Sequence, residues 1–457
     1  MKKRDSAAAI IIVAFLVPFF VFQINFFSKS RLSSVTVTHP IKLHQASESK
    51  SLALNVITKR VPQENRPLKT RRTRQITCDR DHKLYDICKI NGPTVLDSNT
   101  STFFLIDPTG PNQIEKIRPY PRKFEKSTMS RVKELTLISG PKGPPCQVQH
   151  KAPALVFSAG GYTGNLFHEF NDGFIPLFIT MHSIFYGVEP VLVISKARDW
   201  WVKKYIELLR STSTHPIINL DNETSTHCFP SANLGLISHG FMTISPKRLP
   251  KPKTLAHFRN FLERSYKGNW VRPKITVTRP RLVLVSRASG LGRVILNQEE
   301  LKEEAERVGF EVVVFEPTAT TELSSAYELI NSSHAMVGVH GAALTHSLFL
   351  RPRAVFIQVV PLGTGWVSEV CFGKPAREMG LRYREYRIGA EESSLIERFG
   401  KDEMIIKDPV AFRGNSWNDK IMDVYLKEQN VRLDLVRFRS YLKEAYRKSR
   451  RLMVKEG

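Results

Sequence analysis

Three side chains that could perform acid–base chemistry lie close together in the sequence. His168 and Asp172 are four residues apart, so a helix would place both on one face, and Glu169 lies next to His168. An imidazole or carboxylate in such a group can take the proton of an attacking hydroxyl. The two could equally form a structural pair that bind only each other. We take Asp172, His168 and Glu169 as the candidate catalytic residues.

A strand, a loop and a helix are predicted to position these residues. Ala154 to Ser158 is a short apolar run typical of a buried strand, and residues 159–164 contain three glycines, as loops often do. Asn165 can cap the helix that follows. The candidates would then lie just beyond the carboxyl end of a strand, where open α/β sheets bind their ligands.

A second candidate group lies in the other half of the chain. The predicted strand 282–286 ends at Arg287, with Arg293 six residues later, and guanidinium groups can bind a diphosphate bidentately. The predicted strand 335–339 runs into His340, Gly341, Ala342 and Ala343, whose small side chains would leave backbone N–H groups open to a phosphate or a base. Both features could instead be structural, a turn glycine and solvated arginines. Dinucleotide-binding and P-loop patterns are absent from the sequence, which argues against those enzyme classes.

Strands alternate with helices through residues 282–359, which predicts a parallel, doubly wound sheet. The first half also has α/β character, with a strand at 190–194 and an amphipathic helix at 199–210. A linker rich in proline and basic residues, 267–281, separates the halves, and a helix at 432–451 is expected near the end. The fold class is therefore predicted as α/β with two domains.

The amino terminus predicts a membrane anchor. Residues 7–27 are uncharged and mostly apolar, long enough for one transmembrane helix, and Lys2, Lys3 and Arg4 should hold the tail 1–6 in the cytosol. A cleaved signal peptide is the alternative. Residues 28–75 are polar and basic, as in a solvated stem.

A lumenal location would explain several features of the rest of the chain. Three N-glycosylation sequons occur, at Asn99, Asn222 and Asn331. Five cysteines follow the anchor: Cys78, Cys88, Cys146, Cys228 and Cys371. Because five is odd, at least one thiol must stay free or pair between chains.

The formal charge of +25 raises the question of an acidic partner. No basic cluster with interleaved aromatics marks a nucleic-acid surface, so no nucleic-acid partner is expected. No cysteine or histidine spacing suggests zinc. Asp79-Arg80-Asp81 has the short D-x-D form that can hold a divalent cation, but it lies beside a cysteine, ahead of any core strand. No metal site is predicted.

At this point the sequence resembles a known family, plant glycosyltransferase family 61. The matching blocks occur in order over about residues 76–450: GGYTGNLFHEFNDGFIPLFIT, SRASGLGRVILNQEE, VGVHGAALTHSLFLRP, QVVPLG, FGKPAREMGLRYREY and EESSL. One departure is Asn297-Gln298-Glu299, where the family more often has Asn-Glu. Six linked blocks are far more specific than any single motif.

The resemblance implies a type II Golgi membrane protein with a GT-B fold, two Rossmann-like domains facing a cleft. Residues 76–274 would form the acceptor-side domain, and residues 275–457 the UDP-sugar domain with a terminal helix. It implies an inverting enzyme with no essential cofactor, which transfers a pentose from UDP-arabinofuranose or UDP-xylose to xylan in cell-wall biosynthesis. The donor-binding candidates are Asn165, Arg287, Arg293, His340, Gly341, Ala342 and Ala343.

Other functions stay open at the sequence level. An N-glycan β-1,2-xylosyltransferase or a protein O-linked N-acetylglucosaminyltransferase would need the same donor site. A catalytically inactive xylan-binding scaffold or a polyanion-binding protein would lack the chemistry. Golgi enzyme complexes or a homodimer are conceivable partners. Trp200, Trp201 and Trp366 could stack on a sugar chain or belong to the core.

Overall fold

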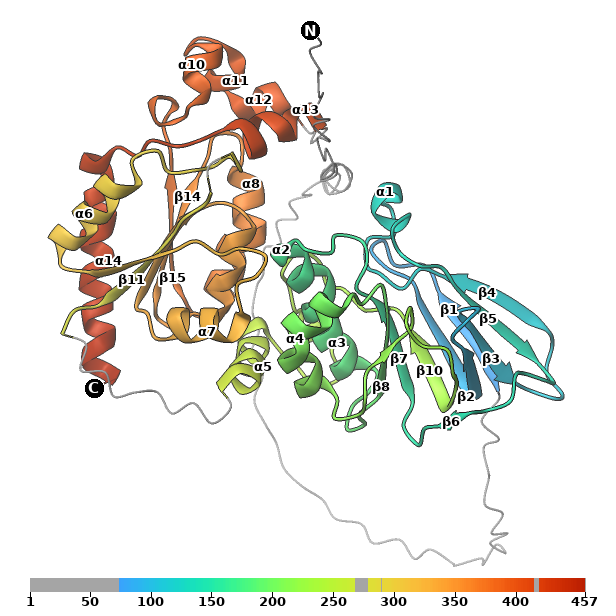
Figure 1. Cartoon of the computed structure of the whole chain (residues 1–457). Coiled ribbons are helices and arrows are strands. Elements are labelled where there is room, and N and C mark those ends of the chain that lie inside the picture. The colour runs from blue at the N-terminus through green and yellow to red at the C-terminus, as the bar shows by residue number, and fades with distance from the viewer. Residues whose placement is uncertain (1–73, 268–277, 289, 415–418, 457) are drawn as a thin grey trace, which may run out of the picture.

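The computed structural model describes residues 74–267, 278–288, 290–414 and 419–456, which form two β-sheets with helices between and around them (Figure 1). The predicted α/β class is confirmed. The predicted tail and anchor, nearly all of the stem and most of the linker lie outside the described residues. Within the described ranges, no helix is both long and apolar enough to span a membrane.

The first sheet is ten-stranded and mixed, in the order β4-β5-β3-β2-β10-β7-β8-β9, with β1 paired to β2 and β6 to β10. The strands are β1 (Gln75–Asp79), β2 (Ile87–Asp97), β3 (Thr102–Ile106), β4 (Gln113–Ile117), β5 (Leu135–Gly140), β6 (Val148–Gln149), β7 (Ala154–Ser158), β8 (Val191–Ser195), β9 (Ile218–Asn219) and β10 (Thr226–Leu234). β10, β7, β8 and β9 are parallel, whereas β2 pairs antiparallel with β10, β1 and β3. A parallel α/β part is thus extended by a largely antiparallel part.

Two disulfides strengthen this sheet. Cys78–Cys88 joins β1 to β2, and Cys146–Cys228 joins the segment before β6 to β10. Cys371 is free and buried. The odd cysteine count is therefore accounted for by one buried thiol.

A layer of helices covers the side of the first sheet that faces the second sheet (Figure 1). The helices of this half are α1 (Lys126–Met129), α2 (Leu166–His168), η2 (Glu169–Phe174), α3 (Ile175–Ser183), α4 (Asp199–Thr212), η3 (Pro246–Arg248) and α5 (Leu255–Lys267). The layer contains α2, α3 and α4, whereas α1 stands apart from it at the top of the picture (Figure 1). α2, η2 and α3 follow one another without a break, and η2 is a wider, π-helical turn.

The second sheet is fully parallel, in the order β12-β11-β13-β14-β15. Its strands are β11 (Arg281–Val285), β12 (Glu311–Phe315), β13 (Ala335–Val339), β14 (Val355–Val360) and β15 (Arg382–Arg387). The chain moves to one side of β11 and then to the other, so the order reverses between β11 and β13. The carboxyl ends of strands at such a reversal form a crevice in which doubly wound sheets bind ligands.

The remaining helices surround the second sheet. They are α6 (Gln298–Val308), α7 (Leu323–Asn331), η4 (Ala342–Phe349), α8 (Gly365–Ser368), η5 (Glu369–Gly373), α9 (Lys374–Glu378), η6 (Ala390–Glu392), α10 (Leu395–Phe399), α11 (Met404–Lys407), α12 (Pro409–Arg413), α13 (Asp419–Met422), η7 (Asp423–Glu428) and α14 (Leu435–Glu456). The long α14 packs mainly along α6 and the second sheet (Figure 1). Near its end, Leu452 joins the apolar cluster to which α5 also belongs.

One apolar cluster runs from β7 and β8 through α5 to β11, β13 and η4, and it connects the two sheets. Trp201 belongs to this cluster and is only 2% exposed. Trp201 is therefore a core residue and cannot stack on a sugar. Trp200 and Trp366 are 43% and 41% exposed.

Candidate functional site

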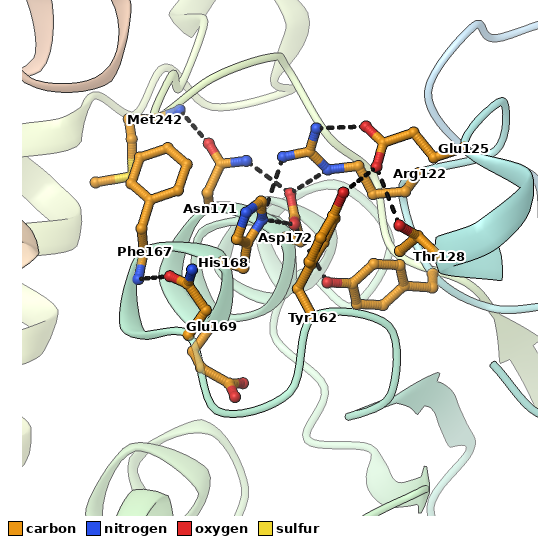
Figure 2. A network of polar contacts seen from close by, with 12 residues as sticks. Arg122, Glu125, Thr128, Tyr162, Phe167, His168, Glu169, Asn171, Asp172 and Met242 are labelled. Atoms are coloured by element: carbon orange, nitrogen blue, oxygen red, sulfur yellow. Dashed lines mark hydrogen bonds and ion pairs between the residues drawn. The ribbon is translucent and has the colours of Figure 1, made fainter. Parts of the chain in front are cut away.

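His168 and Asp172 form a buried pair at the start of the helix that follows β7. The Asn165 side chain accepts the N–H of Phe167 at 3.1 Å, which fixes where the helix begins. One turn later, His168 Nδ1 lies 2.6 Å from Asp172 Oδ2, and both side chains are almost fully buried (Figure 2). The predicted contact on one helix face is therefore present.

Arg122 holds this pair from a distant part of the chain, the loop between β4 and α1. Its Nε donates to Asp172 Oδ1 at 2.9 Å and its NH1 donates to Glu125 Oε1 at 2.9 Å (Figure 2). A third nitrogen, NH2, lies 3.4 Å from His168 Nδ1. All four side chains are buried, so their charges act through little intervening water.

Asp172 receives two further hydrogen bonds. The Tyr120 hydroxyl donates to Oδ2 at 3.2 Å, and Asn171 Nδ2 donates to Oδ1 at 2.6 Å. With Arg122 and His168, four donors surround the carboxylate, about as many as its lone pairs can accept. Both carboxylate oxygens of Asp172 thus accept hydrogen bonds.

The electrostatics assign different states to the two members of the pair. Burial alone would raise the pKa of Asp172, but the positive charge of Arg122 and the contact with His168 lower it below its usual range. Burial lowers the pKa of His168, against the opposing effect of Asp172. At neutral pH the arrangement therefore contains a carboxylate and a neutral imidazole, the form of histidine that can accept a proton.

Tyr162, from the loop between β7 and α2, fixes the plane of the imidazole. Its ring stacks on His168 with 3.9 Å between ring centroids and 18° between planes. Its hydroxyl donates to Glu125 Oε2 at 2.9 Å, and Thr128 donates to the same oxygen at 3.2 Å. Glu125 thereby connects Tyr162 to Arg122, so ring and guanidinium are held by one carboxylate.

Glu169 is adjacent in sequence but faces another environment. Its Oε2 accepts the indole N–H of Trp201 at 2.7 Å, and its Oε1 accepts the N–H of Gly164 at 2.7 Å. Burial raises the pKa of Glu169 to about 7. Glu169 thereby joins the glycine-rich loop to α4. This role suits a residue that helps to position Tyr162, which belongs to that loop.

The second candidate group lies between the ends of β11 and β13. A Cβ at Gly341 would collide with the Arg287 guanidinium, and Gly341 has a φ of 153°, so glycine allows Arg287 to lie against the backbone. Arg293 NH1 donates to the His340 carbonyl at 3.2 Å. His340 in turn lies 3.0 Å from the Gln358 amide, which the Tyr383 hydroxyl also contacts. Ala342 and Ala343 begin η4 directly after this turn.

The two arginines are close to each other and lack acidic partners. Among the described residues, neither Arg287 nor Arg293 forms an ion pair, and Arg287 Nε and NH1 and Arg293 Nε are buried without a hydrogen-bond acceptor. Burial lowers the pKa of both groups, and Arg287 adds to the effect on Arg293, whose pKa falls to about 9. Two half-buried positive charges, with several guanidinium nitrogens shielded from water and no counter-ion among the described residues, indicate a binding site for an anion.

The two candidate groups both lie at the contact between the two sheets. α2, which carries His168, packs against η4, which begins after His340 and Gly341. The Phe372 ring meets His340 at 5.4 Å and Phe167 at 5.8 Å between centroids. One phenylalanine thus connects the two candidate groups.

The other predicted sites are placed as follows. Asn99 and Asn222 are exposed, whereas Asn331 is half-buried and its Nδ2 donates to the Phe349 carbonyl at 3.0 Å. Asp79 accepts the backbone N–H of Asp81 at 3.0 Å, as in a turn. Within the described residues, no group of three or more acidic, histidine or cysteine side chains is arranged to hold a metal ion.

Arg122, Glu125 and Tyr120 were not predicted. They lie about 50 residues from Asp172 in a segment rich in proline and basic residues, where nothing marks one arginine over its neighbours. Tyr162 and Asn171 do lie within the block first identified as catalytic, so the block itself was the available signal.

The chain is similar to proteins of one known family. A family model described as Glycosyltransferase 61 matches residues 166–357, which include both candidate groups. The chain is 40% identical over 429 residues to xylan glycosyltransferase MUCI21 of Arabidopsis thaliana, covering 87% of this chain and 85% of that protein. It is 35% identical over 426 residues to alpha-1,3-arabinosyltransferase XAT3 of Oryza sativa subsp. japonica, covering 91% and 71%. It is 36% identical over 396 residues to beta-1,2-xylosyltransferase XYXT1 of the same rice, covering 81% and 83%. The chain therefore belongs to glycosyltransferase family 61 and is a glycosyltransferase.

Proposed function

We propose that the protein is an inverting glycosyltransferase that transfers arabinofuranose or xylose from a UDP-sugar to the xylan backbone. The relatives' names support the acceptor class, since they act on xylan or transfer arabinose or xylose. The observation that carries the donor is the pair of half-buried arginines without acidic partners among the described residues, Arg287 and Arg293. A diphosphate would supply the missing negative charge.

For the donor, Arg287, Arg293 and the turn from His340 to Ala343 are proposed to bind the diphosphate and uridine. Arg293 is already oriented by the His340 carbonyl, so little side-chain freedom would be lost on binding. Because two fixed cations face the site, transfer should not require an added metal ion, and activity in excess EDTA tests this. Asn165 remains a candidate, although its side-chain oxygen already caps α2.

For the chemistry, we assign His168 as the base and Asp172 as the group that orients it. The 2.6 Å contact with the carboxylate places the proton of a neutral imidazole on Nδ1, so Nε2 would accept the proton of the acceptor hydroxyl. The acceptor oxygen then bonds to the anomeric carbon while the bond to UDP breaks and its electron pair leaves with the β-phosphate. Attack from the face opposite UDP inverts the anomeric configuration. Asp172, with four donors on its oxygens, is poorly suited to take that proton itself.

We further propose that the two sheets form the two halves of a GT-B enzyme, residues 76–274 on the acceptor side and 275–457 on the donor side. Residues 7–27 would anchor the protein in the Golgi membrane with the folded part in the lumen. Protease protection of the folded part in sealed microsomes tests the orientation. Cross-linking in those membranes tests for Golgi complexes or a homodimer.

The function is tested with the lumenal residues 76–457 and a panel of UDP-sugars. We expect one pentose to be added to a xylo-oligosaccharide from UDP-arabinofuranose or UDP-xylose, with the product read by mass and linkage analysis. Pentose on an N-glycan, or N-acetylglucosamine on a peptide, with none on xylo-oligosaccharides, would favour the other two transferases instead. Binding of xylo-oligosaccharide without consumption of any UDP-sugar would identify an inactive scaffold, and salt-sensitive binding to acidic polymers alone a polyanion-binding protein.

A further inference from the structure

One exposed tryptophan contacts a loop that is joined to the proposed catalytic pair. Trp366 lies in the first turn of α8, after β14, and is 41% exposed. An exposed indole offers a flat apolar face against which another flat group can pack. α8 lies on the side of the second sheet that faces the first (Figure 1).

Trp366 meets a residue of the other sheet's loops. Its ring contacts Phe241 edge to face, with 6.4 Å between centroids and 88° between planes. Phe241 lies in the loop after β10, and β10 is parallel to β7, so this loop and the one carrying Tyr162 leave the same edge of the first sheet. The backbone N–H of Met242 donates to Asn171 Oδ1 at 2.7 Å, which ties the loop to the catalytic helix.

Phe241 also contacts Arg122, which is bound to the catalytic pair. The Arg122 guanidinium lies 5.3 Å from the centroid of the Phe241 ring, and the same guanidinium donates to Asp172. A continuous series of contacts therefore runs from the exposed indole through Phe241 and Arg122 to Asp172 and His168. Two side chains, Phe241 and Arg122, therefore connect the exposed indole to the proposed base and its partner.

We infer that Trp366, supported by Phe241, is the stacking platform for the sugar chain that accepts the pentose. This inference rests on the proposed xylan acceptor and names the surface that binds it. A xylopyranose ring has no hydroxymethyl group, so its C–H face is flat and apolar while its hydroxyls point outward. Such a face covers an indole well and leaves the hydroxyls to reach His168.

The uracil ring of the donor is the other flat group that could cover Trp366. The position argues for the acceptor. The donor arginines follow β11 and contact the turn after β13, whereas Trp366 follows β14, further along the sheet. Phe241 belongs to the acceptor-side half and contacts Arg122, the residue that holds the His168–Asp172 pair. The ring contact of the indole therefore leads to the acceptor-side half, through Phe241 to Arg122.

Trp366→Ala, Trp366→Phe and a control, Trp200→Ala, test the platform. Trp200 is equally exposed, but no ring contact links it to the catalytic pair. With xylohexaose as acceptor, Trp366→Ala should raise KM about tenfold, which corresponds to about 1.4 kcal/mol, while KM for the UDP-sugar and the affinity for UDP stay unchanged. Trp366→Phe should recover most of the loss, and Trp200→Ala should behave like the wild type.

Two results would overturn the inference: an unchanged KM for xylohexaose in Trp366→Ala, or a loss of UDP affinity, which would place the donor base on the indole. If the wild type transfers nothing to xylo-oligosaccharides, the proposed function fails. The platform is then judged by calorimetric titration of xylohexaose in the absence of donor. Binding by the wild type that is lost in Trp366→Ala supports it, and no binding by the wild type refutes it.

Discussion

Replacing Arg287 with methionine tests two consequences of an arginine pair without a counter-ion. One is the affinity for UDP, and the other is the stability of the unliganded protein. Methionine keeps the length and apolar stem of the side chain and removes the charge. Each charge-assisted hydrogen bond to a phosphate should contribute about 1.5 to 3 kcal/mol, so the Kd for UDP should rise about 10- to 150-fold.

The same change should not weaken the unliganded protein. Burial and the neighbouring Arg287 together lower the pKa of Arg293 from its ordinary 12.5 to about 9, which corresponds to roughly 5 kcal/mol of unfavourable environment for that charge. Arg287→Met removes the second of these causes. The Tm without nucleotide should therefore stay the same or rise, and about 2 °C would correspond to roughly 1 kcal/mol.

Two measurements on one sample test this: calorimetric titration with UDP, and thermal unfolding with and without UDP. Arg210→Met is the control, since Arg210 is an exposed arginine at the end of α4, on the first sheet. Unchanged UDP affinity in Arg287→Met would remove the arginine pair from the donor site. A large loss of Tm without nucleotide would show that Arg287 has a structural partner and contradict the idea of an unsatisfied charge.

Three further predictions follow from the buried groups and the sequons. Asp172→Asn should lower kcat by at least about 100-fold, with UDP affinity retained. The sequence alone predicts an unchanged Tm for this variant. The structure predicts a lower Tm, because the loss of the buried ion pair with Arg122 should cost about 3 kcal/mol. The pKa of Glu169 is raised from its ordinary 4.5 to about 7, so the folded state binds more protons than the unfolded state between these values. The free energy of unfolding should therefore fall by about 3 kcal/mol as the pH rises from 5 to 8. Glu169→Gln should abolish that pH dependence in denaturant unfolding, and a pH dependence that persists would contradict the assignment. Peptide mass mapping of secreted protein should find glycans on Asn99 and Asn222 but little on Asn331, whose amide is bound to the Phe349 carbonyl; full occupancy there would show that this contact forms too late to matter.

The parallel parts of the fold could be predicted well from the sequence because they are local. The predicted strands at 154–158 and 335–339 are β7 and β13, and the predicted helix at 199–210 is α4 with two more residues. Each is an apolar or amphipathic run of ordinary length between clear turn signals. The final helix begins three residues later than expected and extends to residue 456.

The centre of the first sheet was not predicted. No strand was predicted between the helix at 199–210 and the linker at 267–281, yet β10 lies there and joins the parallel part of the sheet to the antiparallel part. Pro230 interrupts β10, and the register against β2 shifts between Phe229 and Ser231. A proline inside a central strand normally argues against a strand, and here a bulge accommodates it. The energetic reason for β10 is long-range pairing, which has no local signature.

The candidate site divides in the same way. His168 and Asp172 could be paired from their spacing, because a helix brings residues four apart together. The state of that pair depends on Arg122, since without a buried guanidinium the carboxylate would have a raised pKa and would be a better base than the histidine. Arg122 reaches Asp172 because the loop after β4 runs to the carboxyl end of β7, where the Pro119 carbonyl accepts the N–H of Ser158 at 3.1 Å. The sequence could therefore name the two paired residues, but the proposed choice of His168 as the base rests on a contact made across the sheet.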